Sequence, residues 1–220
     1  KLVSDNKAKN GTLIITDDQR KGKGRRENTW ISSPEKNLSF SFLLIPQLEN
    51  TKFGLLSLLS GVGMCEGIEQ SCGIVCKLKW PNDILIKNKK VGGILIETKE
   101  INNKFYICIG IGLNVNDDLS HFPINIKNSS TSLYLENNQL AQRELLLSTI
   151  LISIENLYLN QIENICEIWM KYCGHINSIV SFNFGHKLIK GKFVGINLDG
   201  YAKIKTEGEL KIYPGGELKL

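Results

Sequence analysis

A short basic segment from Gln19 to Arg26 contains the first residues whose types suggest chemistry. Its sequence, Gln-Arg-Lys-Gly-Lys-Gly-Arg-Arg, places Gly22 and Gly24 among cations. Glycine lets a backbone bring several N–H groups to one anion, and arginine adds two-point contact to a phosphate or carboxylate. The segment predicts an anion-binding loop, although a solvated basic loop or a nucleic-acid contact would look the same. It is not a P-loop, because no Gly-Lys-Ser/Thr follows at the required spacing.

A second segment, Lys79-Trp80-Pro81-Asn82-Asp83, combines an aromatic ring, a rigid turn, an amide and a carboxylate at the end of a predicted strand. Polar groups placed there can contact a ligand. However, most tryptophans are core residues, and Asn and Asp are common turn formers. Both interpretations stay open on this motif alone.

A third segment reads Lys-Val-Gly-Gly-Ile-Leu-Ile-Glu and begins at Lys90. Gly92 and Gly93 lie inside a predicted strand, where glycine costs stability and leaves no side chain to pack. A ligand lying against the backbone is a frequent reason for such glycines, and a β-bulge is the alternative. Lys90 can reach a phosphate or carboxylate from the head of the strand, although most hairpin lysines are simply solvated.

A fourth segment, Gly-Ile-Gly-Leu-Asn-Val-Asn from Gly110 to Asn116, resembles half of a dinucleotide-binding fingerprint. Val115 stands where the third glycine should be, so the spacing excludes a Rossmann-type site. Taken alone, this Gly-x-Gly is a weak signal.

The elements that position these segments are short strands separated by turn residues. Segment 12–16 is a run of β-formers and predicts a buried strand, whereas 17–28 is polar and glycine-rich and predicts a loop. Further strands are predicted at 38–45, 75–80, 84–86, 91–98 and 105–115. Short strands joined by tight turns favour an antiparallel meander over βαβ units.

Helical spacing of apolar residues predicts helices at 51–70, 137–159 and 162–172, the first weakened by Gly61 and Gly63. The pattern changes again near residue 176. Short glycine-punctuated strands are predicted at 180–182, 188–196, 201–205 and 209–213. This pattern is typical of a small β-barrel appended to the preceding domain.

Composition narrows the function classes. The 220 residues, 42% of them apolar, suit one ordinary domain plus a small one. A formal charge of +5 permits an anionic ligand such as a nucleotide but is far from a polybasic nucleic-acid surface. No apolar run reaches the ~18 residues of a bilayer span, and no signal peptide opens the sequence. We therefore expect no nucleic-acid or membrane partner.

The six cysteines contain no Cys-x-x-Cys pair, and the three histidines are scattered. A zinc site is therefore not expected. Free thiols in a cytoplasmic protein are the simplest interpretation.

The order and spacing of the four segments together resemble the biotin–protein ligase family. The resemblance continues through Ser130-Thr131-Ser132-Leu133 and ends on the closing Gly-Glu-Leu-Lys-Leu at residues 216–220, so it covers nearly the whole chain. It implies an α+β fold: a mixed, largely antiparallel sheet flanked by helices, like class II aminoacyl-tRNA synthetases, followed by a small SH3-like barrel. We expect a catalytic domain at 1–174 and the barrel at 175–220.

The resemblance also implies an activity. The family forms biotinyl-5′-AMP from biotin and MgATP, and a lysine amine of a biotin carrier protein or carboxylase domain then attacks the activated carbonyl. No covalent enzyme intermediate is needed, so no nucleophile constellation is expected. Family members are monomers or homodimers.

Particular residues match functional positions of the family. Lys90 and Arg25 are the expected catalytic residues. The implied biotin-binding residues are Gln19, Gly22, Gly24, Arg25, Arg26, Lys90, Gly92 and Gly93. The implied ATP-binding residues are Arg25, Arg26, Asp83, Lys90 and Asn114, with Asp83 and Asn114 also implied as Mg²⁺ ligands.

The sequence departs from the family pattern in its loop and near its start. Lys23 and Glu27 stand where arginine and glycine are usual, so the loop loses a planar two-point contact and gains a negative charge. The Ser/Thr-Asn signature expected near the first strand is absent. The sequence as given shows no winged-helix DNA-binding segment ahead of the core, so we expect the monofunctional type.

Two alternatives remain. A lipoate or octanoate ligase shares the fold, but the arginine-bearing loop favours the biotin branch. A nucleic-acid-binding module would use the basic loop together with barrel aromatics such as Phe182, Phe184, Phe193 and Tyr201. Alternation along the predicted strands makes those aromatics more easily core residues.

Overall fold

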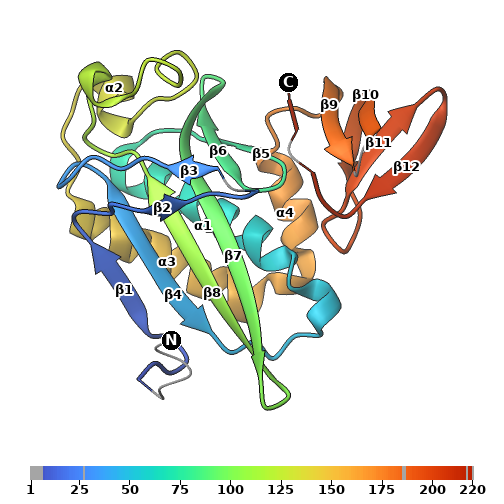
Figure 1. Ribbon diagram of the computed structural model, residues 1–220, viewed down its shortest axis with the longest axis horizontal. Helices are drawn as coiled ribbons and strands as arrows, with labels where there is room; N and C mark the ends of the chain where they lie inside the picture. The colour runs from blue at the N-terminus through green and yellow to red at the C-terminus, as the bar shows by residue number, and fades with distance from the viewer. Residues whose placement is uncertain (1–6, 27, 185–186, 217, 220) are drawn as a thin grey trace.

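The computed structural model describes residues 7–26, 28–184, 187–216 and 218–219. A six-stranded sheet forms its centre, in the order β1-β4-β8-β7-β6-β5, with every neighbouring pair antiparallel (Figure 1). Its strands are β1 (Leu13–Thr16), β4 (Leu38–Leu44), β5 (Lys77–Lys79), β6 (Asp83–Ile86), β7 (Lys89–Ile101) and β8 (Lys104–Leu113). The predicted meander is confirmed, and among the described residues parallel pairing is confined to isolated bridges such as Leu78 with Cys173.

Helices cover one face of this sheet, behind it in Figure 1. They are α1 (Leu55–Cys72), α3 (Arg143–Asn160) and α4 (Ile165–Tyr172), while the short α2 (Leu133–Asn137) lies at the upper end. Single 3₁₀ turns occur at Asn50–Lys52, Leu119–His121 and Ile162–Asn164.

Glycines inside α1 explain how the two long helices pack closely. A Cβ at Gly63 would lie 2.5 Å from Cγ1 of Ile154, and one at Gly67 would lie 2.6 Å from Cγ1 of Ile150. Both isoleucines belong to α3 and are buried. Glycines that cost helix propensity therefore permit close helix–helix contact, which puts the apolar face of α1 against both α3 and the sheet.

Strand β1 corrects one expectation. Its four residues were predicted to be buried, but all four are exposed, and Ile14 and Ile15 are each 49% accessible. The reason is topological, since β1 pairs only with β4 and forms the edge of the sheet. An apolar run alone does not separate a central strand from an edge strand.

The segment expected to be a loop is partly ordered as a hairpin. Strand β2 (Gly22–Lys23) pairs with β3 (Thr29–Trp30), and both cross in front of the central sheet on the side away from the helices (Figure 1). We call residues 17–37, which join β1 to β4, the basic hairpin. Glu27 lies outside the described residues, so its predicted effect is not addressed by the structure.

The C-terminal part forms a four-stranded antiparallel sheet in the order β12-β11-β10-β9. Its strands are β9 (Ile179–Phe184), β10 (Lys187–Ile196), β11 (Ala202–Thr206) and β12 (Glu209–Tyr213). The chain then returns along β9, where Ser181 pairs with Lys219. Indole Nε1 of Trp80 donates to the carbonyl of Gly200 at 2.9 Å, so Trp80 is a core residue that ties the two sheets together.

The α+β class with a small C-terminal β-unit is thus confirmed. Among the described residues no single helix combines the length and apolarity of a bilayer span. Only the bent pair Arg143–Asn160 and Ile162–Tyr172, with 92° between its halves, meets that test.

Candidate active site

A cavity of about 430 Å³ lies between the central sheet and the basic hairpin. Its floor is made of small residues from three adjacent strands. The register aligns Ser39, Gly112 and Gly93 in one row across β4, β8 and β7, and aligns Ser41 with Gly110 in the next. Because glycine and serine barely rise above the backbone, a ligand can lie directly against the sheet here.

Trp30 of β3 closes part of this floor. A Cβ at Gly112 would lie only 2.6 Å from indole Nε1 of Trp30, so the ring packs flat against the glycine. That nitrogen is buried and has no hydrogen-bond partner among the described residues. The absence of a side chain at Gly112 therefore sets the height at which the hairpin sits above the sheet.

Cations surround the cavity. The lining includes Lys21, Lys23, Arg25, Arg26, Lys79 and Lys90, while its acidic residues are Asp83 and Glu97. This excess of positive charge suits a ligand, or two ligands, carrying negative charge.

Lys90 and Asp83 form the central ion pair of the site. Nζ of Lys90 lies 2.5 Å from Oδ1 of Asp83, and Nζ of Lys79 lies 2.9 Å from Oδ2. Burial would raise the pKa of the Asp83 carboxyl, but the charges of Lys90 and Lys79 outweigh it and hold that pKa below its ordinary value. Asp83 is therefore ionised near neutral pH and keeps both lysines at the wall of the cavity.

A β-bulge places Lys90. Ile84 of β6 faces Gly92 whereas the next residue, Leu85, faces Lys90, so Val91 is the extra residue in β7. The bulge rotates Lys90 toward Gly93, where an added Cβ would lie 3.3 Å from its Cε and Nζ. The predicted bulge is therefore present, one residue before the glycine pair, and Gly93 leaves room for the lysine, while the predicted ligand contact stays a prediction.

Arg25 joins the hairpin to two distant parts of the chain. Its Nη1 donates to Oδ1 of Asn82 at 3.3 Å and to the carbonyl of Gly216 at 3.1 Å. Leu218 also lines the cavity. The C-terminal residues thus complete the site and hold the tip of the hairpin over the sheet.

The structure brings most of the expected site residues to one place. Those lining the cavity are Gln19, Gly24, Arg25, Arg26, Asp83, Lys90 and Gly93. The other three, Gly22, Gly92 and Asn114, are not among its lining residues. Gly22 packs under Trp30, and an added Cβ at Gly92 would face Met64 in the core at 3.1 Å.

Asn114 follows β8 and serves a neighbouring loop. Its side-chain amide donates to the carbonyl of Thr131 at 3.0 Å, and its backbone N–H donates to the backbone carbonyl of Val91 at 2.8 Å. The residue is buried. These contacts position the Ser130–Leu133 stretch behind Lys90.

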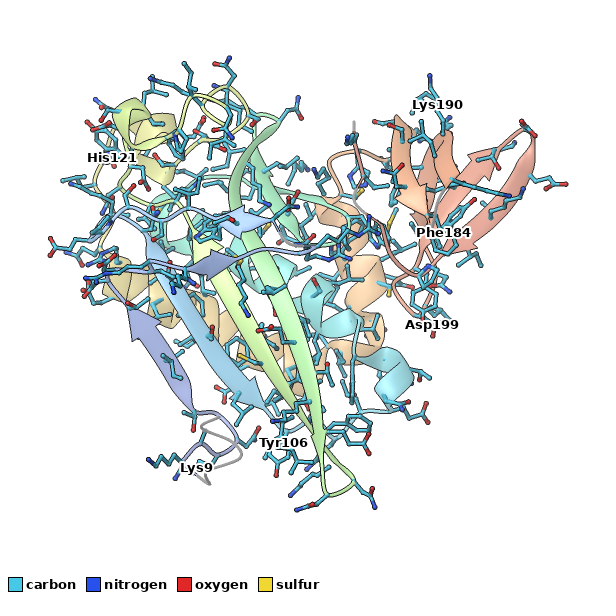
Figure 2. All side chains as sticks on the ribbon, in the orientation of Figure 1. Lys9, Tyr106, His121, Phe184, Lys190 and Asp199 are labelled. Carbon is cyan, nitrogen blue, oxygen red and sulfur yellow. The ribbon has the colours of Figure 1, made fainter. Side chains whose placement is uncertain are left out.

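The expected Mg²⁺ ligands do not fit a metal site in this arrangement. Both carboxylate oxygens of Asp83 are engaged by lysines, and Asn114 lies outside the cavity lining. No group of three or more His, Cys, Asp or Glu residues in the described part of the chain could hold an ion. His121 lies near α2 (Figure 2), His175 is buried at the start of the C-terminal sheet, and His186 is outside the described residues.

Sequence reasoning missed several residues of the floor and wall, among them Trp30, Ser39, Ser41 and Gly112, the glycine on which Trp30 packs. The serines alternate with Leu38, Phe40 and Phe42 in β4, so period-two alternation did carry a signal. The alternation indicates which face of β4 points away from the core, but it does not indicate whether that face meets solvent or a ligand cavity.

This fold and cavity define a class of protein. Residues 1–114 match the family model described as Biotin/lipoate A/B protein ligase family, and residues 175–218 match the Biotin protein ligase C terminal domain. The chain belongs to this ligase family.

The relatives place it within the biotin branch. The Bifunctional ligase/repressor BirA of Bacillus subtilis is 33% identical over 217 residues, covering 96% of this chain and 67% of its own. The Biotin–[acetyl-CoA-carboxylase] ligase of Paracoccus denitrificans is 30% identical over 105 residues, 46% of this chain and 43% of its own. The solved biotin protein ligase of Aquifex aeolicus in complex with biotin and ATP superposes with a TM-score of 0.81 at 30% identity, covering 96% of this chain and 89% of that one.

These findings confirm the predicted branch over the lipoate alternative. The nucleic-acid-binding alternative is not tested by these findings. Phe182 and Phe193 are buried in the C-terminal sheet as expected, whereas Phe184 is 44% exposed, so the expectation of a core residue is wrong there. Lys190 points away from the central sheet at its outer end (Figure 2).

Proposed function

We propose that this chain activates biotin with ATP and transfers it to a lysine of a biotin carrier protein. The observation that carries the proposal is the row of small residues Ser39, Gly112 and Gly93 with Lys90 at its end and a ring of cations above it. A compact ring system with a carboxylate tail fits a shallow floor that Trp30 partly covers and that ends at a lysine.

The first half-reaction joins two anions. The biotin carboxylate oxygen attacks the α-phosphorus of ATP, the bond to the bridging oxygen breaks, and pyrophosphate leaves. Coulomb repulsion between carboxylate and triphosphate opposes this approach, and Lys90, Arg25 and Arg26 offset it. Alignment of the carboxylate with the α-phosphorus contributes by positioning.

The second half-reaction needs no nucleophile from the enzyme. The neutral ε-amine of the acceptor lysine attacks the acyl carbonyl, an amide forms, and AMP leaves with the bonding electrons while the amine loses its proton. The basic hairpin, held by Arg25, would exclude water from the mixed anhydride until the acceptor arrives.

The individual residue roles belong to this proposal. Gln19 on the hairpin would bind the biotin head group, and Gly22 and Gly24 would let the hairpin approach it. Gly92 and Gly93 would act differently, Gly93 by opening the cavity and Gly92 by packing the strand on the core. Asn114 would support the wall behind Lys90 through Thr131.

Magnesium is proposed as part of MgATP, where it would neutralise charge on the phosphates. Mg²⁺ commonly keeps several waters and binds through substrate phosphates rather than a full protein cage. Because Asp83 is occupied by two lysines, we do not assign it, or Asn114, as the principal ligand.

The domain division at 174/175 is also proposed, supported by a second family model that begins at residue 175. The acceptor is proposed as the carrier domain of a carboxylase, in line with the printed name of the Paracoccus relative. A homodimer and a cytoplasmic location stay predictions, which sedimentation velocity and cell fractionation would test.

Calorimetric titration with biotin, then with biotin plus MgATP while pyrophosphate is measured, tests the activation step. We expect biotin binding and ATP-dependent pyrophosphate release, followed by labelling of a carrier domain. Binding of lipoate in place of biotin, or no pyrophosphate release, would refute the proposal.

A further inference from the structure

Arg143, the first residue of α3, contacts both ends of the basic hairpin. Its Nη1 donates to Oδ1 of Asp17 at 2.8 Å and to the backbone carbonyl of Asn37 at 3.0 Å. Asp17 directly follows β1, and Asn37 directly precedes β4. One guanidinium nitrogen thus links the entry and the exit of the segment that carries Gln19 and Arg25.

The position of Arg143 on its helix does not explain its presence. A cation in the first turn of a helix opposes the helix dipole, which favours negative charge there. The two hydrogen bonds of its side chain described above both go to the base of the basic hairpin, and the side chain is only 21% exposed. The residue therefore serves the hairpin rather than the helix.

Backbone bonds close the same base. The N–H of Glu35 donates to the carbonyl of Asp17 at 2.9 Å, and that of Asn116 donates to the carbonyl of Lys36 at 2.9 Å. These bonds join the hairpin to itself and to the end of β8. Arg143 adds a side-chain link between the base of the hairpin and α3, which belongs to the helical layer behind the sheet.

We propose that Arg143 is a positioning residue that fixes the basic hairpin by tying both of its ends to α3. Through that tie it sets the height of Gln19, Arg25 and Trp30 above the glycine floor. The part of this inference that concerns biotin rests on the proposed function, whereas the part that concerns the hairpin does not.

Limited trypsin digestion of the ligand-free full chain tests the hairpin directly. The segment carries cleavable bonds after Arg20, Lys21, Lys23, Arg25, Arg26 and Lys36. We expect Arg143→Met to speed cleavage within it about tenfold, the effect of losing charge-assisted hydrogen bonds. Asp17→Asn removes the opposite charge at a largely exposed position and should speed cleavage less.

Asp18→Asn is the matched control. It breaks an exposed ion pair with Arg20, two residues further along the chain, and keeps every trypsin site. Its cleavage rate should equal that of the wild type. Arg143→Lys should recover most of the protection, because a single nitrogen makes both bonds and an ammonium can donate twice.

Biotin kinetics supply the second measurement. Arg143→Met should raise KM for biotin about tenfold while kcat at saturating biotin stays within about twofold, because the bound state re-forms the hairpin. Arg143→Lys should return KM toward the wild-type value. A merely structural role would lower the amount of active enzyme, and hence kcat, without this split.

Unchanged cleavage in Arg143→Met would overturn the inference, whatever the kinetics. So would faster cleavage that spreads evenly over the chain with a lowered melting temperature, because it would indicate general destabilisation. If Arg143→Met is cleaved faster within the hairpin while the wild-type protein shows no ligase activity, the tie is upheld and the proposed function is refuted. The two failures are therefore distinguishable.

Discussion

The ammonium nitrogen of Lys90 and carboxylate Oδ1 of Asp83 lie 2.5 Å apart across the β6–β7 hairpin. The same carboxylate holds Lys79 through its second oxygen. One negative charge therefore orients two positive ones, and the group keeps a net positive charge facing the cavity. An arriving carboxylate or phosphate can share Lys90 without displacing it from Asp83, because an ammonium group has three donors.

Replacing Lys90 by Ala should abolish adenylate formation while leaving the fold intact. The site loses its central cation, and removal of one such group commonly costs about 10²–10³ in kcat. Pyrophosphate release measures the step, and circular dichroism checks the fold. Lys89→Ala, which changes the exposed neighbour on β7, should retain activity. Normal pyrophosphate release from the Lys90 variant would contradict the assigned role.

Replacing Arg25 by Gly should release the activated intermediate. The variant loses the bonds to Asn82 and Gly216, so the hairpin tip detaches from both the core and the C-terminal residues. We expect the adenylate to dissociate about tenfold faster in a filter-binding chase, the cost of two such bonds. Arg20→Gly, at an exposed position of the same hairpin, should hold the intermediate normally. Equal retention by the Arg25 variant would mean that the hairpin is not a lid.

Replacing Gly112 by Ala should displace Trp30. The new methyl group would overlap the indole ring, so the hairpin must rise and biotin affinity should fall by about tenfold or more. Tryptophan fluorescence reports the displacement, and calorimetry reports the affinity. At Gly110 the nearest atom to an added Cβ is 3.4 Å away, at Oγ of Ser41, so Gly110→Ala should leave the fluorescence unchanged. A Gly112 variant with unshifted fluorescence would contradict the packing described.

The burial of His175 predicts that the free energy of unfolding decreases at acidic pH. Burial between Trp169 and Phe193 lowers its pKa to about 4, and Nε2 has no hydrogen-bond partner among the described residues. Below about pH 6.5 the His175 imidazole is protonated in the unfolded chain, whereas in the folded chain it stays neutral down to about pH 4. Stability should therefore fall as the pH drops from 6.5 to 4, by roughly 3 kcal/mol in total.

The His175→Gln variant tests that dependence. It should lose less stability than the wild type between pH 7 and pH 4.5 in urea titrations, because glutamine takes up no proton. Parallel curves for His175→Gln and the wild type would show that the acid response has another origin.

The sequence predicted the strands of the meander and the C-terminal sheet within a few residues, because turn chemistry and period-two alternation are local signals. It also placed Asp83 directly before the strand predicted at 84–86 and Lys90 directly before the strand predicted at 91–98. Their direct pairing depends on the bulge at Val91, which shifts the register of β7 by one residue and so changes the face to which Lys90 points. Apart from the two glycines, the sequence does not indicate this bulge.

Other contacts were not predictable from local patterns. Arg143 meets Asp17 across 126 residues of sequence, and Arg25 meets Gly216 across 191. Such pairs are set by which elements become neighbours in the folded chain. The exposure of β1 has the same origin, since only the strand order reveals that it is an edge.

The closure of the cavity by Gly216 and Leu218 carries a consequence for synthesis of the protein. The floor, the hairpin and Lys90 leave the ribosome early, but Arg25 finds its carbonyl partner only after residue 216 has emerged. Until then a nascent chain has an open, unfinished pocket. We expect ligase activity to appear only after Gly216 and Leu218 have docked, so that biotin is not activated before the C-terminal sheet has formed.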